Sequence, residues 1–129
     1  MCRKVIQAEE GGVIEVWGDG TAIRNFTYVD DMVGAIYLLT QSDLKGSVNF
    51  GGEEYVTVEE LAKTVIAVSG KDIRVQHVDG PVGVHSRNFS KARSHSLGWD
   101  TKVALREGIA RTYAWIEEQV RKSRVELEG

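Results

Sequence analysis

The stretch Gly18-Asp19-Gly20-Thr21-Ala22-Ile23-Arg24-Asn25-Phe26-Thr27-Tyr28-Val29-Asp30-Asp31 decides the fold that this sequence predicts. Its Gly-Asp-Gly start predicts a tight turn. The residues after it read as an extended segment, with Arg24, Phe26 and Tyr28 on one face. Asp30 and Asp31 then indicate a helix start, because carboxylates stabilise the positive end of a helix dipole. A turn, a short strand and a helix are therefore expected in direct succession.

Short elements on both sides of this stretch predict an α/β (mixed α+β) fold of short strands with about three to four helices. Thr57 and Glu60 form a capping box, and Gly70 is the expected end of the helix that follows. The helix after Tyr28 has its apolar residues at helical spacing, at Val29, Val33, Ile36 and Leu39. The other expected segments are strands at 13–17, 48–50 and 73–77 (the last with Ile73, Val75 and His77 facing inward), helices at about 91–96 and from 104 onward, and the last turns of a helix at 2–9.

Composition and length narrow the class of protein. The chain has 129 residues and a formal net charge of −3, which gives no electrostatic case for nucleic acid. We expect one domain over 1–121 and a charged tail over 122–129. The only cysteine is Cys2, and no apolar run approaches the roughly 20 residues that cross a bilayer. With no secretory leader recognised at residues 1–10, a cytoplasmic location is expected.

Motifs of catalysis and of metal binding do not occur in the sequence. It contains no glycine-rich dinucleotide motif that opens a helix after a strand, no Tyr-x-x-x-Lys, no nucleophile elbow, no P-loop and no His-Glu-x-x-His. His77, His85 and His95 have spacings typical of no metal site. We therefore expect no complete Rossmann unit, no catalytic residue and no metal ligand in this chain.

Arg24 is the first candidate binding residue. It lies between apolar residues shortly after the glycine turn, and a cation in such surroundings needs a partner. One reading is a salt bridge to Asp30 or Asp31. The other is a bidentate contact with a phosphate group, which suits the planar guanidinium. The residues alone leave both open.

A second candidate group stands in the loop after Gly80-Pro81 and consists of His85, Arg87 and Asn88. Loops at strand ends commonly carry binding groups, although a solvated loop explains the same residues. The acidic residues of the chain are better explained as turn, helix-start and strand-end residues than as acid–base groups; these are Asp19, Asp30, Asp31, Glu53 and Glu54.

Read together, several segments resemble the extended short-chain dehydrogenases/reductases, the NAD-dependent epimerase/dehydratase family. The stretch 18–31 resembles that family's Gly-Asp-Gly…Arg-x-Phe-x-Tyr-Val-x-Asp motif. The matching segments then follow in the same order along the chain: Val48-Asn49-Phe50-Gly51-Gly52, Thr57-Val58-Glu59-Glu60-Leu61-Ala62, Ser90-Lys91-Ala92-Arg93 with Leu97-Gly98-Trp99, and Leu105-Arg106-Glu107-Gly108-Ile109 with Thr112-Tyr113-Ala114-Trp115-Ile116.

The resemblance implies the C-terminal, substrate-binding portion of a sugar-nucleotide epimerase or dehydratase, with 1–121 as the substrate-binding domain. Arg24 matches the family arginine that grips the diphosphate, and Arg87 matches a second arginine beside the nucleotide. His85 and Asn88 complete the expected set, although His85 stands where the epimerase motif has arginine, and Asn88 where many relatives have aspartate. The parent enzyme uses NAD, whose binding glycines match no residue here, so this chain alone is expected to bind none.

A different class of function is a stand-alone binding or oligomerisation module that remains after gene truncation, without enzymatic activity. In a whole enzyme of the family, the segments 30–41 and 48–50 would pack on the nucleotide-binding half. Without that half their apolar faces need another cover. The sequence therefore also predicts a homo-oligomer.

Overall fold

The computed structural model describes residues 1–81 and 83–128, with side chains as far as residue 123, and these residues form helices interspersed with short strands. The elements are α1 (Cys2–Gln7), β1 (Val13–Trp17), β2 (Ile23–Asn25), α2 (Val29–Thr40), β3 (Tyr55–Thr57), α3 (Val58–Ser69), β4 (Arg74–Val78), α4 (Ala92–Ser96) and α5 (Leu105–Glu128). This confirms the mixed fold. The described residues form five helices where about three to four were expected; the two short ones, α1 and α4, lie within the segments 2–9 and 91–96 for which helical turns were expected.

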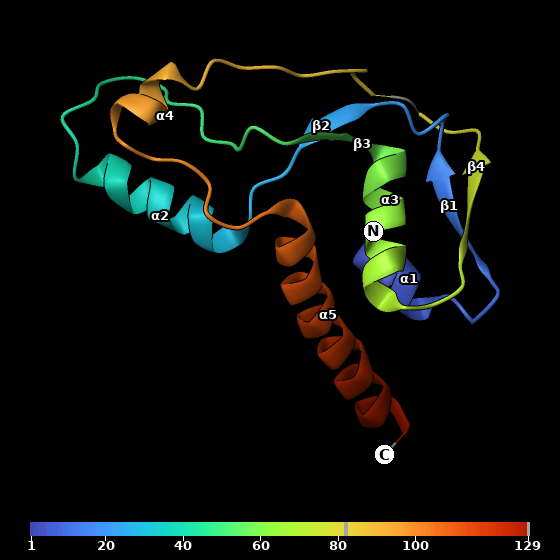
Figure 1. The fold of residues 1–129 in the computed structure, drawn as a ribbon. Coiled ribbons are helices and arrows are strands. Elements are labelled where there is room, and N and C mark those ends of the chain that lie inside the picture. Colours follow the sequence, from blue (N-terminus) through green and yellow to red (C-terminus); the bar gives the residue numbers. More distant parts are fainter. Residues whose placement is uncertain (82, 129) are drawn as a thin grey trace.

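Two small sheets organise the strands. β1 pairs in parallel with β4, from Val13 opposite Arg74 to Trp17 opposite Val78. β2 pairs antiparallel with β3, so that Arg24 stands opposite Val56. A single parallel bridge joins Ile23 to Ser86 and brings the loop after β4 alongside β2. The second sheet therefore lies at the meeting point of three segments that are distant in sequence (Figure 1).

The main core forms where α1, α3 and α5 pack together beside the β1–β4 pair (Figure 1). Ile14 and Val16 point inward from β1 while their neighbours are exposed, which is the alternation expected of a half-buried strand. The buried residues of this core are Val5, Ile14, Val16, Ala62, Val65, Ile73, Ile109 and Tyr113. The apolar stripe predicted for the last helix is confirmed at Ile109 and Tyr113.

The capping box predicted for α3 is present at its first turn. The Glu60 amide donates to the Thr57 hydroxyl over 3.0 Å, and the Thr57 amide donates to the Glu60 carboxylate over 2.7 Å. Hydrogen bonds from the Thr57 amide and from the Thr57 hydroxyl to the Glu60 carboxylate hold the pKa of Glu60 below its usual value. Gly70 ends the helix with φ of 69°, a left-handed conformation that glycine adopts without strain.

A second lobe contains α2, α4 and the loops that connect them to the core (Figure 1). Asp31 and Ala35 are the buried residues of α2. Beside them, Trp99 is buried and meets the Phe50 ring edge to face, with 5.0 Å between the ring centroids. The apolar stripe of α2 faces outward instead: Val29, Val33 and Ile36 are 61%, 59% and 55% exposed.

Three of the sequence-based expectations need correction. Residues 48–50 form no strand, because no described segment offers their backbone a ladder of hydrogen bonds. The strand is instead Tyr55–Thr57, which pairs with β2. The extended segment after Arg24 stays in a strand only to Asn25. On β4, Ile73 precedes the strand and is buried, whereas His77 is exposed rather than turned inward.

Candidate anion-binding site

Three backbone segments lie side by side around Arg24. On one side β2 pairs with β3. On the other side the Ile23 amide donates to the His85 carbonyl over 2.8 Å, and Ile23 bridges to Ser86. Two of the elements that carry predicted site residues, β2 and the loop over 85–88, are therefore brought together by the fold.

Arg24 is half-buried, and its side chain lies across the end of this loop. One guanidinium nitrogen, Nη1, donates to the carbonyl of Ile23 over 2.7 Å and approaches that of His85 at 3.4 Å. Among residues 1–81 and 83–123, whose side chains are described, Arg24 forms no ion pair. The salt-bridge reading is thus not realised, and Asp31 instead accepts the backbone amides of Lys102 and Val103.

Arg87 stands beside Arg24 in the register of the two segments. Each arginine follows one residue after the bridged pair Ile23 and Ser86. Because successive residues of extended chains point to opposite faces, the register predicts that both guanidinium groups lie on one face. Like Arg24, Arg87 forms no ion pair within the described residues. Two neighbouring cations without a carboxylate form a surface that suits a polyanion.

His85 and Asp19 lie near one another beside this surface. The His85 side chain is exposed, two residues before Arg87. Asp19 accepts the Thr21 amide over 3.0 Å and the Thr21 hydroxyl over 2.7 Å. These bonds, with a smaller contribution from nearby His85, hold the pKa of Asp19 below its usual value. Asp19 therefore stays ionised, and its carboxylate accepts its hydrogen bonds from within its own turn.

Asn88 makes contacts of a different kind from the two arginines. Its Oδ1 accepts the Tyr55 hydroxyl over 3.2 Å and the Phe89 amide over 2.9 Å. This oxygen is therefore engaged by the protein itself. Sequence reasoning missed Tyr55, whose signal would have been an aromatic residue just before the capping box.

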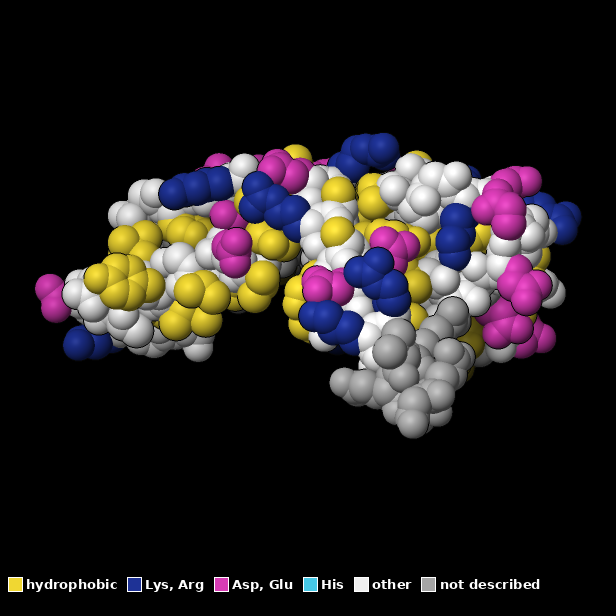
Figure 2. All heavy atoms as spheres, turned by 90° about the horizontal axis from the view of Figure 1, so that it is seen from below, with side chains coloured by type: hydrophobic (Ala, Val, Ile, Leu, Met, Phe, Trp, Pro, Cys, Tyr) yellow, Lys and Arg dark blue, Asp and Glu magenta, His cyan; other side chains and the backbone are white. Residues whose placement is uncertain are grey.

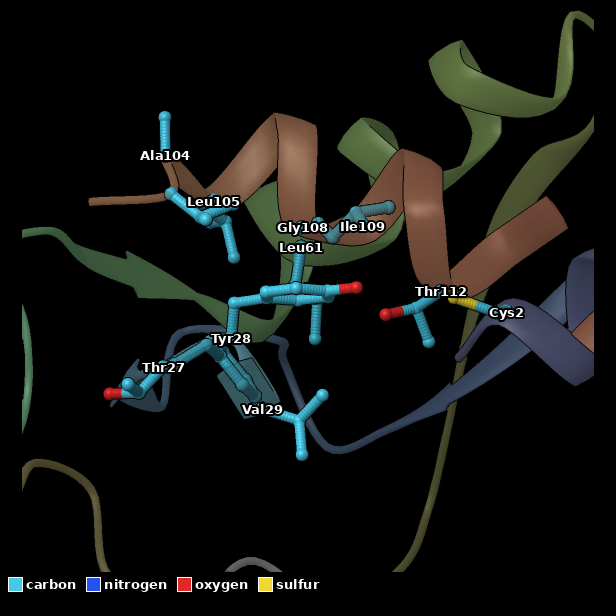
Figure 3. A pocket seen from close by; sticks show the side chains of 12 residues that line it. Cys2, Thr27, Tyr28, Val29, Leu61, Ala104, Leu105, Gly108, Ile109 and Thr112 are labelled. Carbon is cyan, nitrogen blue, oxygen red and sulfur yellow. The ribbon is translucent and has the colours of Figure 1, made fainter. Parts of the chain in front are cut away.

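An apolar pocket of about 370 Å³ lies between the start of α2 and the first turns of α5. Its hydroxyl groups come from Tyr28 and Thr112, which point toward one another (Figure 3), and from Thr27. Partial burial raises the pKa of the Cys2 thiol, which also lines it. The lining is mainly hydrocarbon and does not include Arg24, so this pocket is not the predicted anion site. The candidate anion site is the surface that carries Arg24 and Arg87.

Within the described residues, no group of three or more His, Cys, Asp and Glu side chains is placed to hold a metal ion. None of the helices in these residues has the length and apolarity that a bilayer crossing requires.

Comparison with known proteins places these features in a family. The model of the NAD dependent epimerase/dehydratase family matches residues 1–51. GDP-mannose 3,5-epimerase of Arabidopsis thaliana is 37% identical over 124 residues, which are 95% of this chain and 32% of that protein. GDP-L-fucose synthase 1 of the same plant is 36% identical over 93% of this chain and 38% of its own length.

Solved structures give the same result. UDP-glucose 4-epimerase from Thermotoga maritima, solved with UDP-glucose, superimposes with a TM-score of 0.82 at 26% identity and covers 92% of this chain and 38% of its own. MoeE5, solved with UDP-glucuronic acid and NAD, has a TM-score of 0.77 at 28% identity, over 91% of this chain and 40% of its own.

The chain is similar to the NAD-dependent epimerase/dehydratase family. It resembles in particular the GDP-mannose 3,5-epimerases, and it spans about a third of the length of the curated relatives that it matches. The resemblance carried by the motifs around Arg24 and Lys91 is thereby confirmed.

Proposed function

We propose that this chain is the C-terminal, substrate-binding portion of a sugar-nucleotide epimerase or dehydratase, and that it contacts the diphosphate of a nucleotide-diphosphate sugar through Arg24 and Arg87. The observation that carries the proposal is the placement of the two arginines one residue beyond the bridged pair Ile23 and Ser86, with no carboxylate paired to either within the described residues. His85 and Asn88 are the proposed flanking contacts. A diphosphate offers each guanidinium a bidentate partner.

NAD belongs to the parent enzyme in this proposal and not to residues 1–129 alone. When bound in such an enzyme, NAD would supply the transient oxidation of a sugar carbon, which would acidify the neighbouring C–H bonds. No Tyr-x-x-x-Lys and no dinucleotide glycine motif occurs in this sequence, so the chain by itself binds substrate without turning it over. A cytoplasmic location is part of the same proposal.

Arg24→Ala is expected to weaken binding of GDP-mannose by about tenfold to a hundredfold, because it removes a charge-assisted contact with phosphate. Calorimetric titration of the wild type and the variant with GDP-mannose and with UDP-glucose measures this change. Arg106→Ala is the matched control, since Arg106 is an exposed arginine at the start of α5. Equal affinities of the Arg24 and Arg106 variants, or no binding by the wild type, would overturn the proposed function.

The exposed face of α2 favours a second candidate, a homo-oligomeric assembly module. Val29, Val33, Ile36 and Tyr37 are all more than half exposed along this helix. Viewed from below, apolar side chains gather over the α2 lobe, and a hollow separates it from the rest of the molecule (Figure 2). A contiguous apolar face of this kind is typical of a surface covered by another protein. We propose that a second copy of the chain covers it.

Ile36→Glu is expected to convert such an oligomer to a monomer, because it places a charge in an apolar contact. Light scattering at micromolar concentration measures the molecular mass of the wild type and the variant. Trp115→Glu on α5 is the matched control, because Trp115 is also a large apolar residue, 63% exposed, outside α2. A monomeric wild type, or an unchanged mass of the Ile36 variant, would contradict the assembly.

A further inference from the structure

Tyr55 stands at the centre of a set of contacts behind the two arginines. Its hydroxyl donates to Oδ1 of Asn88 over 3.2 Å, which ties β3 to the residue that directly follows Arg87. The Lys91 ammonium lies 5.3 Å from the centre of the Tyr55 ring. This aromatic residue therefore contacts the loop over 85–91 at two places, on either side of Phe89.

Lys91 anchors the same loop to the chain that leads into β3. Its side chain is only 10% exposed, and its ammonium pairs with the Glu53 carboxylate at 2.8 Å. It also donates to the carbonyl of Gly52 over 2.9 Å. With a carboxylate, a carbonyl and an aromatic face around it, this cation is satisfied within the protein and is not available to a ligand.

Asn25 makes the corresponding tie from β2. Its Nδ2 donates to the carbonyls of Gly52 and Glu54 over 2.8 and 2.7 Å. The Gly52 carbonyl thus accepts from both Asn25 and Lys91. The residue after Arg24 and the loop that carries Arg87 are consequently fastened to one short segment, residues 52–55.

We propose that Tyr55 and Lys91 are positioning residues that hold Arg87 beside Arg24, so that the pair acts as a two-point contact selective for a diphosphate over a single phosphate. The inference rests on the proposed function, because it assumes that the arginines bind the anion. A loop already held in place loses less conformational freedom on binding than a free loop does. A ligand that contacts both arginines therefore binds more tightly when the loop is held in place. A single phosphate that contacts only Arg24 is unaffected by the position of the loop.

Tyr55→Phe tests the proposal, because it removes only the hydroxyl that contacts Asn88 and keeps the ring beneath Lys91. The probes are GDP and GMP, which differ by one phosphate, and their dissociation constants are measured by calorimetry. We expect the variant to bind GDP about threefold to tenfold more weakly while its affinity for GMP is unchanged, as loss of one hydrogen bond implies. Tyr37→Phe is the matched control, on an exposed tyrosine of α2.

Lys91→Met is the second variant and should lower the preference for GDP in the same direction. Circular dichroism and thermal unfolding of each variant check that the fold is retained. Suppose that the wild type binds GDP more tightly than GMP and that Arg24→Ala abolishes this preference. If the Tyr55 and Lys91 variants then keep the preference, the positioning role is wrong and the proposed function stands. An equal loss of GDP and GMP affinity in these variants would also overturn it, as a general structural effect. No binding of either nucleotide by the wild type would overturn both proposals.

Discussion

Replacement of Trp99 by alanine should lower the free energy of unfolding by about 3–5 kcal/mol, the range found for buried aromatic residues. Trp99 is 8% exposed, meets Phe50 edge to face, and donates from Nε1 to the Asp31 carbonyl over 3.2 Å. Its removal leaves a cavity at the point where α2 meets the loop before α5. Urea unfolding followed by circular dichroism measures the change.

Trp115→Ala provides the comparison for this first variant. Trp115 is 63% exposed on α5, so the same substitution there removes little buried surface. We expect a change within about 0.5 kcal/mol, as for other surface positions. If both tryptophan variants lost the same stability, Trp99 could not be the anchor of the α2 lobe.

Asp31→Ala should cost about 3 kcal/mol, because it leaves two backbone amides without an acceptor. Asp31 is 7% exposed, and one of its carboxylate oxygens accepts the amides of Lys102 and Val103, each over 3.0 Å. These bonds hold the chain just ahead of α5 against the first turn of α2. The measurement is again equilibrium unfolding in urea.

The neighbouring carboxylate supplies the control. Asp30 is exposed in the same helical turn, so Asp30→Ala changes the charge near the helix start without removing those two bonds. Its expected cost is below about 1 kcal/mol. A loss for Asp31→Ala no larger than that for Asp30→Ala would show that the paired amides contribute little. Since Trp99 and Asp31 share one junction, a double variant should lose less than the sum of the two.

Local signals in the sequence were sufficient for most elements. The capping box at Thr57 and Glu60, the glycine at the end of α3 and the carboxylates at the start of α2 act within one helical turn, and each is present in the structure. The long apolar stripe of α5 was equally readable, because helical periodicity over many residues is the strongest pattern of this kind.

Pairing between distant segments was not readable in the same way. Residues 48–50 and 55–57 are both short and rich in strand-forming residues, and only the second meets a partner, in β2. Strand formation depends on that partner more than on intrinsic preference. The register of Ile23 with Ser86 likewise joins positions that no local pattern connects.

For the candidate site, sequence motifs supplied the arginines, and the structure supplied their surroundings. Arg24 and Arg87 were singled out from their local sequence and then matched to the family motifs, whereas the contacts of Tyr55 and Lys91 behind them depend on three segments meeting. Asp31, which sequence reasoning treated as a possible partner of Arg24, is engaged by backbone amides of the loop before α5. A carboxylate buried by a distant loop cannot be recognised from spacing along the chain.

The packing of α1 against α5 has a consequence for how this polypeptide acquires its structure. Val5 from α1 and Tyr113 from α5 belong to one buried cluster. The backbone hydrogen bonds of β1 likewise form only when β4 is present, because β4 is its partner strand. Because the contacts of the buried cluster join α1 to α5, this core cannot close until α5 is present. Long-range closure of this kind slows folding relative to helical proteins with mostly local contacts. A polypeptide of residues 1–104 should therefore be sensitive to protease, whereas residues 1–129 should resist it.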